Sequence, residues 1–143
     1  MSSVPSAVEV IRQRPDMYFP HGVTPDAICL CLADDALAMG AAHVRVDNVD
    51  QWRIVSSDVD WLRLPERRVV ALDRLFVGMH VHPSRVNGVR SEIFVGAFAV
   101  AAYVATPCEV SAVVGGYALP ESVCRVLCPP MCVRSVAFLL GAG

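Results

Sequence analysis

Apolar residues recur with helical spacing in four segments of the chain, which predicts helices at residues 6–14, 24–39, 69–77 and 92–105. The start at Thr24 is the clearest, because a Thr N-cap accepts a backbone hydrogen bond and Pro25 suits the first helical position. Gly40 then predicts the end of this helix.

Between the helices, apolar and polar residues alternate in short runs that are typical of strands. The alternation predicts a hairpin around Asn48 and a second hairpin across Gly115 and Gly116. The predicted strands are residues 43–47, 51–56, 109–114, 117–119 and 134–140, and a polar loop is predicted at 79–90. These elements predict an α+β two-layer sandwich, in which helices cover one face of a mostly antiparallel mixed sheet.

The length of 143 residues suits a single domain with one core. The chain is 55% hydrophobic with a mean hydropathy of +0.49, yet no run reaches the roughly 18 apolar residues that span a bilayer. We therefore expect no membrane insertion, and a protein partner or a small apolar molecule that covers the excess apolar surface. Residues 1–7 lack an export signal, which predicts a cytoplasmic protein.

All 12 basic residues are Arg, and the net charge is −2. An amine nucleophile on a side chain is therefore excluded, and dispersed arginines on a slightly acidic chain argue against direct binding of nucleic acid. The use of Arg alone is typical of a GC-rich bacterial genome. The six cysteines are expected to be reduced. Pro129 and Pro130 interrupt the spacing of Cys124, Cys128 and Cys132, so we predict no metal site and no cofactor.

Residues 10–19, VIRQRPDMYF, resemble the VRKRPGMYIG segment of the gyrase B subunit and its relatives, the GHKL (Bergerat-fold) ATPases. Four further segments follow in that family's order and resemble its helix-to-strand unit, its nucleotide-binding loop, its helix ending in LHAGG, and a later helix and strand. These segments are DDALAMGAAHVRV (34–46), RIVSSDVDWL (53–62), LDRLFVGMH (72–80) and FAVAAYVATPCEVSAV (98–113). The resemblance implies a GHKL-like domain over most of the chain.

The resemblance also implies that the groups that bind and hydrolyse ATP are missing. The family's catalytic Glu and its Mg²⁺-binding Asn fall on Ala27 and Cys31, and neither a methyl group nor a thiol can replace them. The adenine-binding Asp falls on Ser57, and Trp61 takes the place of a glycine beside the purine. Of the glycine-rich lid motif, which cradles phosphate, only Gly96 remains.

Several acidic and histidine side chains would lie around the former nucleotide pocket under this resemblance, and they could supply an acid and a base to another substrate. The candidate catalytic residues are Asp34, Asp58, Asp60 and His80, and the candidate ligand-binding residues are Cys31, Asp35, Trp61 and His82. The same carboxylates also suit ordinary structural roles, and Trp61 either walls a remodelled pocket or plugs an abandoned one.

Three functions from different classes remain open. The favoured one is a pseudo-ATPase of the GHKL fold that neither binds nor hydrolyses ATP and serves as a binding or interaction module. The second is a small enzyme or ligand-binding protein of bacterial specialised metabolism, which would apply acid–base chemistry to a small apolar substrate. The third is an atypical ATP-binding protein that uses Asp58 or Asp60. The balance favours a protein that is not an enzyme, and self-association as a homodimer stays open.

Overall fold

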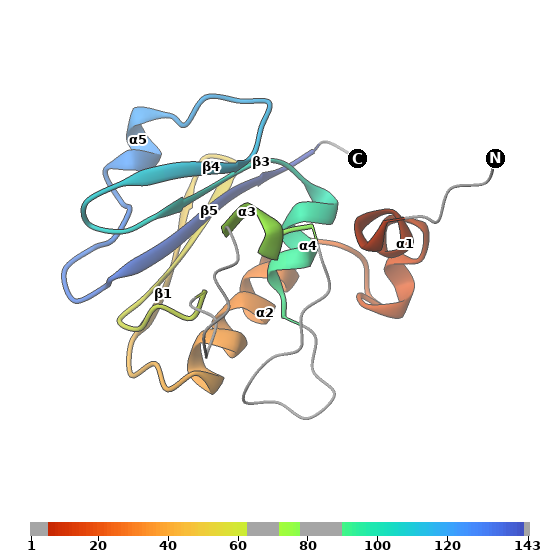
Figure 1. Cartoon of the computed structure of the whole chain (residues 1–143), viewed down its shortest axis with the longest axis horizontal. Helices are drawn as coiled ribbons and strands as arrows, with labels where there is room; N and C mark the ends of the chain where they lie inside the picture. Colours follow the sequence, from red (N-terminus) through yellow and green to blue (C-terminus); the bar gives the residue numbers. More distant parts are fainter. Residues whose placement is uncertain (1–5, 63–71, 78–89, 142–143) are drawn as a thin grey trace.

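In the computed structural model, which describes residues 6–62, 72–77 and 90–141, the chain forms an α+β domain around an open five-stranded sheet (Figure 1). The strand order is β1-β2-β5-β3-β4, and each neighbouring pair is antiparallel. The strands are β1 (Val44–Val49), β2 (Trp52–Ser57), β3 (Ala99–Ala105), β4 (Val110–Val114) and β5 (Arg134–Leu140). The helical elements are α1 (Ala7–Gln13), η1 (Pro15–Met17), α2 (Pro25–Ala38), α3 (Leu72–Leu75), α4 (Glu92–Phe98) and α5 (Glu121–Cys124).

The first two helices begin at capping residues, and Thr24, the cap of the second, was predicted as such. Ser6 Oγ accepts from the backbone N–H of Glu9 over 3.2 Å at the start of α1. Thr24 Oγ1 accepts from the N–H of Ala27 over 3.1 Å at the start of α2. Gly40 follows α2 with a φ of 97°, in the left-handed region that favours glycine. The predicted start and end of α2 are therefore confirmed.

The predicted first hairpin is confirmed as β1 and β2, which pair in register from Val44 with Ser57 to Val49 with Trp52. Its turn lies at Asp50, two residues later than the predicted centre, and Asp50 has a φ of 53°. The last strand, β5, has the predicted bounds. It lies between β2 and β3, so the final segment of the chain completes the middle of the sheet.

The prediction of one helix over residues 92–105 is wrong. The helix α4 ends at Phe98, Ala99 is extended with φ −80° and ψ 145°, and β3 occupies the rest. Short apolar runs suit a helix and a buried strand equally well by periodicity. Here β3 hydrogen-bonds to β5 on one side and to β4 on the other, so its backbone groups are satisfied in the sheet.

The predicted second hairpin is also wrong in its later half. Gly115 and Gly116 do not connect two strands, and residues 117–119 are not a strand. The chain instead runs from β4 to the short helix α5, and the Tyr103 hydroxyl on β3 donates to the Tyr117 carbonyl over 2.7 Å. The partner of β4 is therefore β3, which precedes it in the chain.

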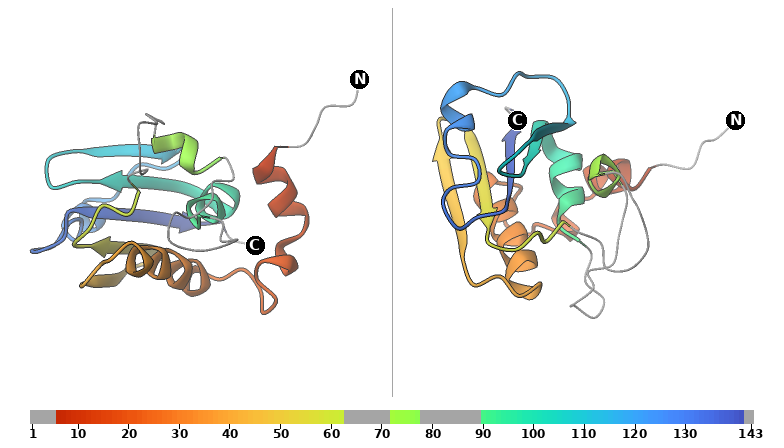
Figure 2. Two further views of the ribbon diagram at one scale, coloured as in Figure 1. Left: turned by 60° about the horizontal axis from the view of Figure 1, so that its bottom comes forward. Right: turned by 60° about the vertical axis from the view of Figure 1, so that its left-hand side comes forward.

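Both faces of the sheet are covered, which corrects the expectation that helices lie on one face only. One face packs against α2 and α4 in the main core, to which Val55, Val104 and Val136 contribute. Neighbouring positions on the same strands point the other way into a smaller core around Val123 of α5. The members of this second core are Trp52, Ile54, Ala101, Val123 and Ala137. Figure 2 shows α5 on the side of the sheet opposite to α2 and α4.

The N-terminal segment packs against α4. Phe19 and Tyr18 contact the ring of Phe94, with ring centroids 4.9 Å and 5.5 Å apart. Arg12 Nε donates to the carbonyl of Ala97, and Ile11 is fully buried in the main core. None of the helices within the described residues is long and apolar enough to cross a membrane.

Candidate functional site

Three segments that are far apart in the sequence meet at a buried site: α2, the loop after β2 and the start of α4. The backbone N–H of Ser91 donates to Asp35 Oδ2 over 2.7 Å, and the Ser91 hydroxyl donates to the Cys31 carbonyl over 3.2 Å. Arg90 Nη2 donates to the carbonyl of Trp61. The candidates Cys31, Asp35 and Trp61 therefore surround one short segment.

An ion pair between Arg90 and Glu92 lies at the centre of this site. Arg90 Nη2 and Glu92 Oε1 are 2.9 Å apart, and the two side chains are 2% and 0% exposed. Among the residues that the structure describes, Arg90 Nη1 and Glu92 Oε2 have no hydrogen-bond partner. Desolvation of two charges offsets much of their attraction, so the pair is a weak source of stability.

Neither partner of this ion pair was a predicted site residue. Arg90 was expected in a polar loop and Glu92 at the start of a helix. The only available signal is a charged pair two residues apart, directly before an apolar run. Charged residues are rarely buried unless paired, so a pattern of this kind does not by itself predict burial.

Burial raises the pKa of the Glu92 carboxyl above its ordinary value of 4.5. The Arg90 charge acts in the opposite direction, and the Asp35 charge adds to the rise. The folded protein therefore retains this proton at pH values where the unfolded chain has lost it. The resulting stabilisation is fully present below about pH 4.5 and is lost as the pH rises through the folded pKa.

We expect the substitution Glu92→Gln to remove this part of the pH dependence. In the wild type, this single group lowers the free energy of unfolding by up to about 1.4 kcal/mol per pH unit between the two pKa values. Urea titrations from about pH 4 to about pH 8 measure it. Glu121→Gln, at an exposed position on α5, is the matched control and keeps the wild-type slope. Equal slopes for wild type and Glu92→Gln would contradict the assignment.

Trp61 is part of the main core. Its side chain is fully buried, in the same cluster as Ile28 and Leu32 of α2. Its Nε1 has no hydrogen-bond partner within the described part of the chain. An indole buried in this way fills volume beside α2, where the family resemblance puts the nucleotide.

Asp58 holds the connection between α2 and β1. Its carboxylate accepts from the backbone N–H of Ala42 at 3.1 and 3.3 Å and from that of His43 at 3.1 Å. The N–H of Asp58 in turn donates to the His43 carbonyl over 3.2 Å. These contacts give Asp58 a structural role, because a charged acceptor on several backbone donors fixes a loop.

The other predicted carboxylates have different surroundings. Asp60 accepts from Arg134 Nε and Nη2, each over 2.9 Å, in a bidentate pair. Asp34 is exposed on α2, whereas its neighbour Asp35 is buried and bonded to the start of α4. The remaining candidates, His80 and His82, lie outside the described residues, so their roles stay predictions.

All six cysteines are free thiols, as expected. Over the described ranges, no group of three or more His, Cys, Asp or Glu side chains could hold a metal ion. Burial raises the pKa of Cys29 to about 12, while the Arg53 charge lowers it and the Asp26 charge raises it by smaller amounts. This thiol therefore stays protonated and is a poor nucleophile.

No protein-family model matches the chain, and neither curated proteins nor solved structures contain a similar one. The resemblance to GHKL ATPases therefore has no support from related proteins.

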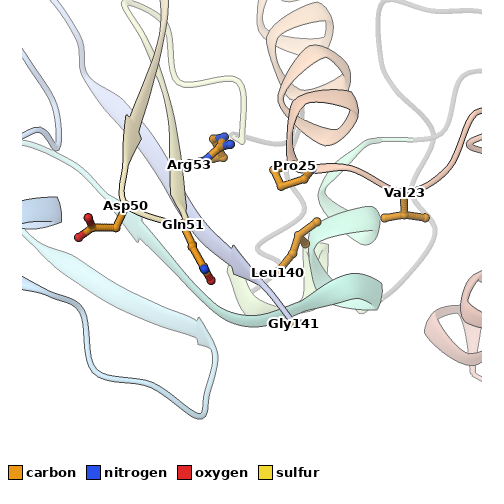
Figure 3. Close-up of a pocket in the computed structure, with 7 residues that line it drawn as sticks. All are labelled: Val23, Pro25, Asp50, Gln51, Arg53, Leu140 and Gly141. Atoms are coloured by element: carbon orange, nitrogen blue, oxygen red, sulfur yellow. The ribbon is translucent and has the colours of Figure 1, made fainter. Parts of the chain in front are cut away.

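A cavity of about 330 Å³ opens at the N-terminal end of α2 (Figure 3). It lies between the segment that leads into α2, the turn of the first hairpin and the end of β5. Its lining residues are Val23, Pro25, Asp50, Gln51, Arg53, Leu140 and Gly141. We call this cavity the Arg53 cleft. It shares no lining residue with the buried site around Arg90 and Glu92.

Proposed function

We propose that the protein is a non-catalytic binding module with a degenerate GHKL-type ATP site, which neither binds nor hydrolyses ATP. The observation that carries the proposal is the complete burial of Trp61 in the core beside α2. In the GHKL resemblance this position belongs to the loop that accommodates the purine. A purine could enter only if the indole left the core.

The contacts of the neighbouring polar groups support the same proposal. The Asp35 carboxylate accepts from the Ser91 N–H, and the backbone carbonyl of Cys31 accepts from the Ser91 hydroxyl. The Asp58 carboxylate accepts from backbone N–H groups of the loop before β1. A general base needs a carboxylate that reaches a substrate proton within hydrogen-bond distance. Asp60 is likewise paired with Arg134. Structural contacts therefore occupy these three carboxylates, and the acid–base alternative rests on Asp34, His80 and His82.

One segment departs from the family resemblance. The segment at residues 98–113 resembles a helix and a strand of the GHKL family, but it folds here as the antiparallel strands β3 and β4. The proposal therefore relies on the part from α1 to the loop after β2, together with α4.

Isothermal titration of the whole chain with ATP and Mg²⁺ tests the proposal. We expect no saturable heat up to millimolar nucleotide, because the catalytic Glu, the Mg²⁺-binding Asn and the glycines are absent together. ADP without Mg²⁺ is titrated in parallel and is also expected to be silent. Saturable binding with a Kd below about 1 mM, which corresponds to roughly 4.1 kcal/mol, would overturn the proposal.

If such binding occurred, Asp58→Asn would identify its origin. Loss of binding in this variant, with Glu121→Gln unchanged, would favour the atypical ATP-binding function, in which Asp58 accepts from the adenine amino group. Binding that survives in Asp58→Asn and also in Asp60→Asn would point to a nucleotide site elsewhere on the chain.

A further inference from the structure

The Arg53 cleft combines an apolar wall with one cation. The apolar wall consists of Val23, Pro25 and Leu140. Val23 precedes α2, Pro25 is its first residue, and Leu140 is the last residue of β5. Figure 3 shows the Pro25 and Leu140 side chains opposite Arg53 and Gln51. The volume of about 330 Å³ is at the lower end of the range of small-molecule sites.

Arg53 occupies an unusual position for a charged residue. It alternates with Trp52 and Ile54, which point into the smaller core, so its side chain lies on the sheet face that α2 covers. Its side chain is only 19% exposed. Among the described residues that line the cleft, it is the one with a positive charge.

The hydrogen bonds of the Arg53 guanidinium within the described residues are long. Its Nε lies 3.5 Å from Asp26 Oδ1, and its Nη1 lies 3.5 Å from the Trp52 carbonyl. The Asp26 side chain is 80% exposed, so water screens this pair strongly. A planar guanidinium normally binds a planar oxyanion through two parallel hydrogen bonds of about 2.8 Å. Arg53 therefore retains capacity for a second acceptor.

The charges near Arg53 restrict what this acceptor can be. Asp26 and Asp50 bring two negative charges to the rim against one positive charge, although Figure 3 shows the Asp50 carboxylate directed away from Arg53. A doubly charged group such as phosphate would meet a net negative surrounding. A single carboxylate is repelled less by Asp26 and Asp50 than phosphate is, and its planar shape matches the guanidinium.

We propose that the Arg53 cleft binds a small monocarboxylate with an apolar body. Arg53 holds the carboxylate, the amide of the exposed Gln51 can donate a further hydrogen bond, and the body packs on Val23, Pro25 and Leu140. This site is independent of the proposed loss of ATP binding, because it shares no residue with the buried site around Arg90.

Phenylacetate is a suitable probe, because it joins one carboxylate to a compact apolar ring. We expect saturable, millimolar or tighter binding by NMR titration of the ¹⁵N-labelled chain, with shifts centred on the first hairpin turn and the start of α2. Phenylacetamide, the neutral analogue, is expected to bind at least about 10-fold more weakly, which equals the loss of about 1.4 kcal/mol. Inorganic phosphate is expected to produce no shifts centred on this cleft.

Arg53→Gln is expected to weaken phenylacetate binding at least about 10-fold. Arg45→Gln removes an arginine that pairs with Asp47 on the exposed strand β1, and it is the matched control with wild-type affinity. Gln51→Trp leaves Arg53 in place and fills the mouth of the cleft, so it keeps the test valid if Arg53→Gln fails to fold. We expect this variant not to bind.

Several results would overturn the proposal. For the wild type, these are the absence of saturable phenylacetate binding and equal binding of phenylacetate and phenylacetamide. For the variants, they are unchanged phenylacetate binding in Gln51→Trp or in a folded Arg53→Gln. Phosphate that bound more tightly than phenylacetate with the same shifts would contradict the carboxylate assignment. ATP titrations of the same samples keep this outcome separate from that of the proposed function.

Discussion

Gly96→Ala is expected to destabilise the protein by at least about 3 kcal/mol or to prevent its folding. A Cβ atom at Gly96, in the middle of α4, would overlap the backbone carbonyl of Phe76, which follows α3. Backbone cannot rotate away as a side chain can, so α4 would have to move from its neighbour. At an unobstructed helical position, the same substitution stabilises a helix by about 1 kcal/mol. The sign of the change in stability therefore shows whether the Phe76 backbone lies against Gly96.

Urea-induced unfolding followed by far-UV circular dichroism measures this change. Gly115→Ala is the matched control, because nothing lies within 4 Å of the added Cβ and no positive φ is required there. We expect the control to stay within about 0.5 kcal/mol of the wild type. If Gly96→Ala were as stable as this control, the close packing of α4 against the Phe76 backbone would be wrong.

Trp61→Ala is expected to destabilise the protein by about 3–5 kcal/mol, the usual cost of removing a large buried aromatic side chain. The side chain is fully buried in the main core, and the loop after β2 cannot collapse freely because Asp60 is held by Arg134. Trp61→Phe retains most of the packing and should cost much less. Urea unfolding of both variants at one pH gives the comparison.

The same variant separates two interpretations of Trp61. If Trp61 only blocked an otherwise intact ATP site, Trp61→Ala would bind ATP. We expect no binding, since Ala27 and Cys31 stand where the catalytic Glu and the Mg²⁺-binding Asn are required. A loss of less than about 1 kcal/mol would show that Trp61 is not the core residue described above.

The candidate site was predicted from the sequence only in part. The resemblance placed Cys31, Asp35 and Trp61 near one another, and the structure brings them around Ser91 and its neighbour Arg90. The resemblance did not indicate which polar groups would be hydrogen-bonded in structural contacts. These contacts depend on backbone N–H donors from other segments, which a local sequence pattern does not predict.

The Arg53 cleft was not predicted. Arg53 read as an ordinary polar position in an alternating strand, next to Trp52 and Ile54. Its capacity to bind an anion arises from the approach of α2 and the end of β5, which come from distant parts of the chain. The sequence contains the cation, and the tertiary structure contributes the apolar wall beside it.

By itself, the sequence determined the elements whose signals are local. Caps at Ser6 and Thr24 and the glycine at Gly40 mark the bounds of α1 and α2. Alternation predicts the first hairpin, and a short apolar run predicts β5. These signals act through hydrogen bonds and φ values within a few residues, so they persist in any surrounding fold.

Only the tertiary structure decided between helix and strand in residues 99–105 and placed α5 on the second face of the sheet. A run of small apolar residues satisfies its backbone groups within a helix or between two neighbouring strands. Pairing with β4 and β5, which lie on either side of β3, therefore decided that this segment is a strand. Burial of Arg90, Glu92 and Trp61 was decided in the same way, because burial depends on which distant segments pack together.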